Sequence, residues 1–234
     1  MRRVGVVVPA KNEARLVVDC IEALAAAAAS VAVPVALALV FDDCTDATPD
    51  LAAGAAARLG LDLRMTEIRA SSVGAARRRG MAETVAALGV AGTWLATTDA
   101  DSVVPPHWLT RQLRHAQAGA SVVAGTVGVE DWSERTAAVR RMAEGAYRGL
   151  ERRHVHGANL GLRAESYMEV GGFIPVERDE DIALMAALAR AGNHIVWADD
   201  LAVTTSSRRV ARVPAGFATY LDGLEGPGVA AVSA

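Results

Sequence analysis

Two aspartates separated by one small residue, Asp99-Ala100-Asp101, are the centre of the chemistry that this sequence predicts. They follow the apolar run Trp94–Thr98, whose branched and aromatic residues predict a buried strand. In an open α/β sheet, ligands bind beyond the carboxyl ends of the strands. Two carboxylates at such a place suit a hard divalent cation that also contacts phosphate oxygens. A polar turn in which Asp99 only caps the chain would explain the same residues, so the motif alone leaves both interpretations open.

Strands and helices are expected to alternate through the first half of the chain. The expected strands are 4–8, 35–41, 61–68, 94–98 and 120–127, with a helix in each interval. This order predicts a parallel sheet with right-handed crossovers. After Gly128 strands and helices no longer alternate regularly. We expect a helix preceded by a capping box at Asp131 and Glu134, a last helix from about Asp181 to Gly192, and a final strand over 195–203.

Polar residues at the strand ends are also the expected helix caps. Asn12 is the predicted N-cap of the first helix and Thr48 that of the second, with Pro49 at the first helical position and Gly60 at the end. Asp46 fits either a helix cap or a site residue, so its role stays open.

Three predicted strands end in polar clusters: Pro9-Ala10-Lys11-Asn12-Glu13, Asp42-Asp43-Cys44-Thr45-Asp46 and Asp99-Ala100-Asp101. Because the carboxyl ends of parallel strands share one edge of a sheet, we expect these clusters to converge. Three polar clusters that converge on one rim favour a ligand site over ordinary turns. A fourth cluster, Asp179-Glu180-Asp181, lies at a predicted helix start.

Length and composition predict one α/β domain over 1–234. The net charge of −3 gives no general attraction to nucleic acid. Cys20 and Cys44 lack metal-ligand spacing and are expected to be reduced, which favours a cytoplasmic protein. No apolar run reaches transmembrane length, while peripheral membrane contact stays open. Lys11 is the only lysine.

The ordered motifs resemble those of family 2 glycosyltransferases with the GT-A fold. The resemblance covers about residues 4 to 205 and rests on the three clusters above together with four later segments: Gly74-Ala75-Ala76-Arg77, Gly157-Ala158-Asn159, Gly171-Gly172-Phe173 and Glu180-Asp181. It implies an α/β fold with a Rossmann-like, mixed and mostly parallel sheet flanked by helices. It also implies a nucleotide-binding half at about 1–128, an acceptor-side half at about 129–205 and a weakly defined C-terminal tail. No Gly-x-Gly-x-x-Gly follows the first strand, which disfavours a dinucleotide-binding domain.

The resemblance also implies roles for individual residues. The nucleotide-diphospho-sugar donor, UDP- or GDP-linked, would be bordered by Pro9, Ala10, Asn12, Glu13, Asp43, Arg77, Asp99 and Ala100. Asp101 would bind Mg²⁺ or Mn²⁺, and Asp181 would be the general base of an inverting transfer, although a helix cap would explain Asp181 as well. The acceptor or donor side would include His156, Gly157, Asn159 and Glu180. Asp42 is expected to be structural.

The sequence alone leaves several other functions open. A nucleotidyltransferase also uses carboxylate-bound metal on such a sheet, although it would normally carry a glycine-rich first loop. A non-catalytic nucleotide-sugar-binding protein and a retaining transferase are also compatible with these residues. The acceptor and the donor base are not fixed, because one scaffold carries many substrates.

Overall fold

The computed structural model describes residues 1–234 except 130–131, 134, 143–154, 177 and 207–234. The described residues form an eight-stranded sheet in the order β3-β2-β1-β4-β7-β6-β8-β5. The strands are β1 (Arg3–Ala10), β2 (Val35–Asp42), β3 (Leu63–Ile68), β4 (Thr93–Thr97), β5 (Ser102–Val103), β6 (Val122–Val129), β7 (Leu160–Arg163) and β8 (Ile195–Thr205).

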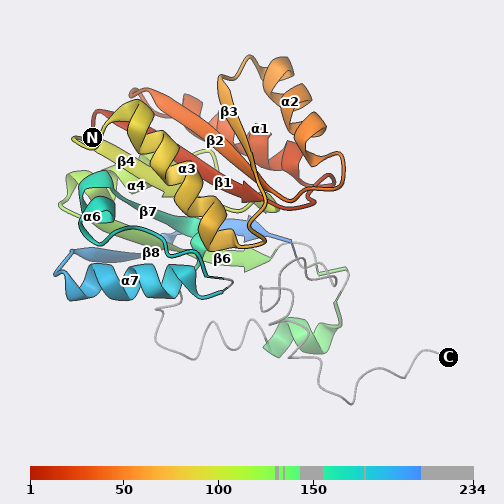
Figure 1. The fold of residues 1–234 in the computed structure, drawn as a ribbon. Helices are drawn as coiled ribbons and strands as arrows, with labels where there is room; N and C mark the ends of the chain where they lie inside the picture. Colours follow the sequence, from red (N-terminus) through yellow and green to blue (C-terminus); the bar gives the residue numbers. More distant parts are fainter. Residues whose placement is uncertain (130–131, 134, 143–154, 177, 207–234) are drawn as a thin grey trace.

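Helices cover both faces of this sheet (Figure 1). One face packs against α1 (Val17–Ala29), α2 (Thr48–Leu59) and α4 (Trp108–Gln117). The other packs against α3 (Val73–Leu88), α6 (Ala164–Glu169) and α7 (Glu180–Arg190). Adjacent strand residues alternate between the two cores: Val6 faces the first and Val7 the second. The continuous apolar runs therefore reflect strands that are buried on both sides.

The central strands β3, β2, β1 and β4 are parallel, as predicted. Ala10 pairs with Phe41, and Val7 pairs with Thr97. The carboxyl ends of β1, β2 and β4 therefore lie at one edge of the sheet.

The other half of the sheet is mixed. β7 runs antiparallel to both β4 and β6, β8 runs parallel to β6, and β5 is antiparallel to β8. The pairing of β6 with β8 is interrupted by a register shift between Gly125 and Thr126. The predicted mixed, mostly parallel sheet is confirmed. The sequence did not predict β5 or β7, because strands of two and four residues give almost no periodic signal.

Two predicted helix caps are wrong. α1 begins at Val17 rather than directly after Asn12, and Asn12 has a left-handed backbone with φ 54°. The Asn12 Oδ1 atom instead accepts from the Thr45 N–H at 2.7 Å. Thr48 is the first residue of α2, and the Thr48 N–H donates to Asp46 Oδ1 at 3.0 Å. Asp46 thus supplies the capping oxygen that was expected from Thr48.

Other predicted boundaries hold. Gly60 ends α2 in a left-handed conformation, and α7 is followed by Gly192 with φ 77°. The capping box at Asp131 and Glu134 lies outside the described residues, although 137–142 are helical. In the part of the chain that the structure describes, no helix has the length and apolar character needed to span a membrane.

A buried polar contact sets the distance between β4, β7 and α4. The Trp94 indole N–H donates to Gln112 Oε1 at 2.7 Å, and both side chains are fully buried. Gly161 on β7 lies directly against this contact, so that a β-carbon at Gly161 would collide with the Gln112 carboxamide. A glycine is therefore required at this position.

We expect Gly161→Ala to lower the free energy of unfolding by about 1–3 kcal/mol, because the added methyl group overpacks the core. Gly54→Ala is the matched control, since Gly54 lies in α2 with open space around it. That control should be neutral or stabilising by up to about 1 kcal/mol. Urea unfolding measures both, and a Gly161→Ala protein as stable as wild type would contradict the packing described.

Candidate active site

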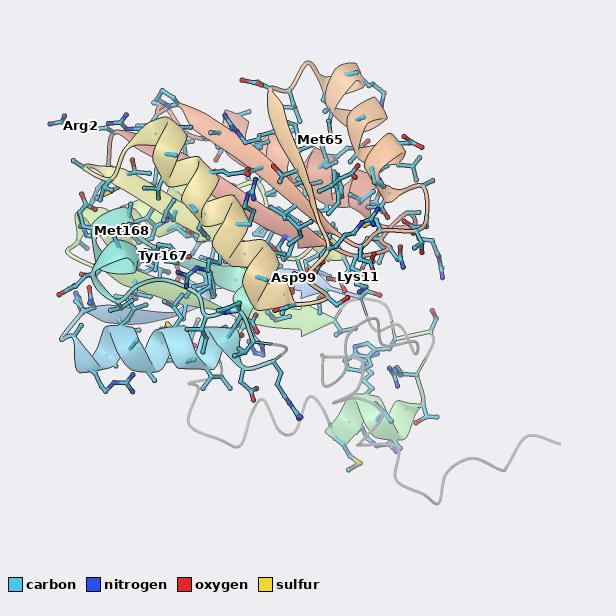
Figure 2. The ribbon with its side chains drawn as sticks, in the orientation of Figure 1. Arg2, Lys11, Met65, Asp99, Tyr167 and Met168 are labelled. Atoms are coloured by element: carbon cyan, nitrogen blue, oxygen red, sulfur yellow. The ribbon has the colours of Figure 1, made fainter. Side chains whose placement is uncertain are left out.

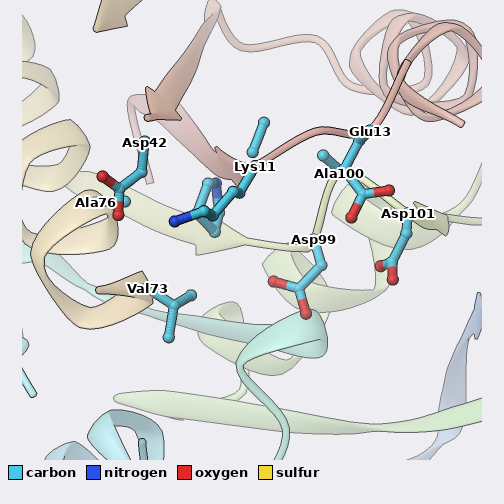
Figure 3. A pocket seen from close by; sticks show the side chains of 10 residues that line it. Lys11, Glu13, Asp42, Val73, Ala76, Asp99, Ala100 and Asp101 are labelled. Carbon is cyan, nitrogen blue, oxygen red and sulfur yellow. The ribbon is translucent and has the colours of Figure 1, made fainter. Parts of the chain in front are cut away.

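A pocket lies at the carboxyl edge of the sheet (Figure 3). Its walls come from the loop after β1, the end of β2, the start of α3 and the loop after β4. The lining residues are Pro9, Ala10, Lys11, Glu13, Asp42, Val73, Ala76, Asp99, Ala100 and Asp101. The structure thus brings together residues from all three strand-end clusters that the sequence placed at this edge.

Asp42 holds one wall of the pocket in place. Its Oδ1 accepts from the N–H groups of Ala70 and Ser71 at 2.8 and 2.9 Å, and its Oδ2 accepts from Ser72 at 2.7 Å. Ser72 is in turn the N-cap of α3, and its hydroxyl accepts from the Ala75 N–H at 3.2 Å. The structural role expected for Asp42 agrees with these contacts, although the residue also lines the pocket.

The two aspartates of the central motif have different partners. Asp99 is about one third exposed and receives the Arg77 guanidinium on Oδ1 at 2.5 Å. Asp101 Oδ1 accepts from the Ser102 hydroxyl at 3.2 Å and the Thr205 hydroxyl at 3.4 Å. Sequence reasoning missed Thr205, because β8 reaches this site only through the register of the sheet.

The buried thiol of Cys20 lies beside the backbone of Asp99. The Cys20 Sγ–H donates to the Asp99 carbonyl at 3.5 Å. Burial raises the pKa of the Cys20 thiol far above its usual range, and the carboxylates of Asp101, Asp99 and Glu13 raise it further. The same negative potential attracts a cation.

The carboxylate oxygens that line the pocket are ligands that suit a hard divalent cation. Among the described residues, no group of three or more His, Cys, Asp or Glu side chains is arranged to hold a metal by itself. Mg²⁺ commonly uses one or two protein carboxylates and completes its shell with water and phosphate oxygens. Asp99 and Asp101 suit a cation shared with a phosphate-bearing ligand rather than a metal held by the protein alone.

The loops after β1 and β2 are joined by hydrogen bonds. The Glu13 N–H donates to the Thr48 hydroxyl at 2.7 Å, and the Ala14 N–H donates to Asp46 Oδ2 at 3.1 Å. Asp43 is exposed, has φ 56° and does not line the pocket. Its predicted contact with the base or ribose stays a prediction.

Lys11 lines the pocket as part of the first strand-end cluster, although sequence reasoning gave it no role of its own. Its Nζ donates to the Ser71 hydroxyl at 3.2 Å, which joins the loop after β1 to the loop before α3. Figure 2 shows Lys11 and Asp99 at the same edge of the sheet. The signal in the sequence was a lone lysine beside a strand end, in a chain whose other basic residues are arginines.

A second cluster adjoins the pocket and contains Arg77, Glu180, Asp181 and Gly157. Arg77 is only 3% exposed, with Nη1 on Glu180 and Nη2 on Asp99. Both terminal nitrogens thus contact carboxylates inside the protein, which differs from the predicted position facing a base or phosphate. The Gly157 N–H donates to Asp181 Oδ2 at 2.7 Å, and the Ile182 N–H donates to Asp181 Oδ1 at 2.8 Å.

The ionisation of this cluster is set by burial and by mutual attraction. Burial raises the pKa of the Glu180 carboxyl, which Arg77 opposes and Asp181 reinforces. Burial disfavours the Arg77 cation, but Asp99, Glu180 and Asp181 outweigh that effect and raise the pKa of Arg77. Arg77 therefore stays positively charged.

Asn159 was expected on the acceptor or donor side, and the structure places it inside the core instead. It is fully buried, and its Oδ1 accepts from the Trp108 indole N–H at 2.9 Å. Its Nδ2 donates to the carbonyls of Thr126 and Leu201 at 2.8 and 2.9 Å. Asn159 therefore shapes the loop from within. His156, which precedes Gly157, is partly exposed.

Residues 5–174 match the sequence model of glycosyl transferase family 2, which is most of the chain. The chain belongs to glycosyl transferase family 2. Among curated proteins no match was found. The family assignment favours glycosyl transfer over the rival nucleotidyltransferase interpretation.

Solved structures of low sequence identity share this GT-A fold. The 1–349 piece of S. aureus TarS, in complex with UDP-GlcNAc, is 15% identical with a TM-score of 0.66; the match covers 92% of this chain and 61% of that one. The mannosyltransferase PcManGT from Pyrobaculum calidifontis, with GDP-Man and Mn²⁺, is 18% identical with a TM-score of 0.66, covering 94% and 68%. Glucosyl-3-phosphoglycerate synthase from Mycobacterium tuberculosis, with Mn²⁺, UDP and phosphoglyceric acid, is 19% identical with a TM-score of 0.63, covering 88% and 72%.

Proposed function

We propose that this glycosyl transferase family 2 protein transfers a sugar from a UDP- or GDP-linked donor to an acceptor hydroxyl, with Mg²⁺ or Mn²⁺ and with inversion. The observation that carries the proposal is the acidic pocket at the ends of β1, β2 and β4, with Asp99 and Asp101 on its wall. The TarS, PcManGT and glucosyl-3-phosphoglycerate synthase structures are complexes with nucleotide sugars or UDP, and two of them contain Mn²⁺, which supports this choice of donor and metal.

In this proposal the donor lies along the loops after β1 and β4. Pro9, Ala10, Asn12 and Glu13 border the nucleotide, with Asp43 toward the base or ribose, and Ala100 adjoins the diphosphate. Lys11 supplies an ammonium group at a rim that is otherwise acidic. A cation there lowers the repulsion between the acidic pocket and a negatively charged donor.

Asp101 is the proposed metal ligand, with Asp99 beside it. The hydroxyls of Ser102 and Thr205 donate to Asp101 Oδ1 and fix its orientation. When bound, a divalent cation stabilises the negative charge that develops on the leaving nucleoside diphosphate.

Asp181 is the proposed general base. The acceptor oxygen attacks the anomeric carbon, the bond from that carbon to the diphosphate oxygen breaks, and the acceptor proton passes to the Asp181 carboxylate. The N–H groups of Gly157 and Ile182 hold the two oxygens of that carboxylate. His156 and Gly157 are proposed to lie on the acceptor side.

Product analysis tests the reaction itself. The protein is incubated with UDP- and GDP-sugars, Mg²⁺ or Mn²⁺, and a panel of acceptors. Glycosyl transfer releases nucleoside diphosphate, whereas a nucleotidyltransferase would release pyrophosphate. The anomeric configuration of the product, read by NMR, separates inversion from retention. Metal-dependent thermal stabilisation by nucleotides without any product would instead support the non-catalytic binding protein.

We expect Asp101→Asn to weaken metal-dependent binding of UDP or GDP by at least about tenfold, since loss of even the partners of metal ligands costs ~10–100-fold. Isothermal titration calorimetry with Mn²⁺ measures this. Asp50→Asn makes the same charge change on the exposed side of α2 and should leave binding unaltered. Equal affinity in the two variants would remove Asp101 from the metal site.

We expect Lys11→Met to weaken nucleoside diphosphate binding by about tenfold, because a hydrogen bond to a charged group contributes about 1.5 kcal/mol. Arg64→Met is the control, since it removes one positive charge from an exposed position on β3. Calorimetry at two salt concentrations compares the variants. If both lose affinity equally, Lys11 acts only through net charge.

We expect Asp181→Asn to lower kcat by about two to four orders of magnitude, the usual contribution of a general base, while donor binding is retained. Asp179→Asn, two residues earlier at the N-cap of α7, is the control and should retain kcat. Near-normal turnover in Asp181→Asn would reduce Asp181 to a helix cap.

A further inference from the structure

The guanidinium of Arg77 is a buried cation that joins the donor edge of the sheet to the start of α7. Its Nη2 contacts Asp99, which follows β4, and its Nη1 contacts Glu180, the first residue of α7. Arg77 lies on α3, so one side chain connects three elements that are far apart in the sequence. The ion pair with Glu180 is buried on both sides, at 3% and 5% exposure.

Packing around the guanidinium extends this connection to Asp181. A β-carbon at Gly157 would collide with the Arg77 guanidinium, so a larger residue there would displace that group. The same Gly157 donates its N–H to Asp181. The Phe173 ring lies on another side, with its centroid 5.8 Å from Arg77 Cζ. The guanidinium therefore contacts both neighbours that hold Asp181: Glu180, which precedes it in the chain, and Gly157, which hydrogen-bonds to it.

We propose that Arg77 is a positioning residue, which holds Asp99 and the first turn of α7 in one fixed arrangement without itself contacting the donor. The inference rests on the proposed function, because only a general base at Asp181 must be held in a fixed position relative to Asp99 and Asp101. It assigns Arg77 a different role from a ligand contact, since both terminal nitrogens are engaged inside the protein.

Removing Arg77 would leave the buried Glu180 carboxylate without a cation, and the resulting loss of stability can be measured. A buried carboxylate without its cation is strongly disfavoured. Arg77 from α3 stabilises the Glu180 carboxylate, whereas the negative charges of Asp181 on α7 and Asp99 after β4 repel it. Without Arg77, Glu180 must take up a proton, or the start of α7 must move toward water.

The first test is Arg77→Gln. We expect the midpoint of thermal unfolding to fall by about 6–20 °C, as for breaking a buried ion pair in a chain of this size. In the same variant kcat should fall at least about tenfold, and the affinity for UDP or GDP with Mn²⁺ should fall by a smaller factor, because Asp99 loses its partner while Asp101 keeps both of its hydroxyl donors. Arg79→Gln is the control: it breaks an exposed pair with Glu83 on the same helix and should leave all three measurements nearly unchanged.

A double variant separates positioning from ligand contact. Arg77→Gln with Glu180→Gln replaces the ion pair by two amides and removes the unpaired buried charge. We expect it to recover at least half of the lost thermal midpoint and part of the lost kcat. If Arg77 contacts the donor, Arg77→Gln should instead lose as much nucleotide affinity as kcat, and Glu180→Gln should restore neither; that result would overturn the inference.

The pH dependence of stability supplies a readout that needs no turnover. With Arg77 absent, the folded state raises the pKa of Glu180 further, so the folded protein favours the protonated carboxyl. Stability is then retained at low pH and lost as the pH rises, so the deficit of Arg77→Gln should grow as the pH rises above the range in which an ordinary glutamate is protonated. Glu180→Gln in that background should abolish this growth.

If Arg77→Gln does not fold but the double variant does, the result supports an unpaired buried charge on Glu180 as the cause. If the double variant is less stable than Arg77→Gln, that explanation is wrong. If the wild type transfers no sugar while the stability cycle behaves as expected, the proposed function fails and the positional role of Arg77 stands. A deficit that is independent of pH and of Glu180 would overturn the inference.

Discussion

Repulsion between carboxylates is the constraint on which the site depends. Parallel pairing of β1 with β2 and β4 brings their carboxyl ends to one edge, and with them Glu13, Asp42, Asp99 and Asp101. Each carboxylate pair at short range costs energy unless donors or cations offset it. The protein uses three backbone N–H groups on Asp42, the guanidinium of Arg77 on Asp99, and two hydroxyls on Asp101. The pocket remains acidic, in keeping with the proposed binding of a divalent cation there.

The fold and the place of the site could be predicted because their signals are local. Apolar runs such as 35–41 mark strands buried on both faces, and a run that stops in aspartates marks a strand end. Once the strands are parallel, Asp42 and Asp99 must lie at the same edge. This required no knowledge of side-chain contacts.

The partners of these residues could not be predicted, because they are set by packing between distant segments. Arg77 and Glu180 are separated by 103 positions, and their ion pair depends on how α3 and α7 cover the same face of the sheet. Thr205 reaches Asp101 only because β8 pairs with β5. Asn12 suited a helix cap by residue type, yet a nearby N–H, that of Thr45, competed successfully for its side chain.

The position of Lys11 makes the pocket accessible to chemical labelling through an amine. The pocket wall carries the ε-amine of the only lysine in 234 residues, so an amine-directed reagent has one side-chain target, besides the terminal amine of Met1. A fluorophore or a crosslinker attached through that amine would sit at the pocket without any engineered cysteine. Because attachment consumes the amine assigned to donor binding, the rate of attachment in the presence of nucleotide, rather than the emission of an attached dye, would follow occupancy of the pocket.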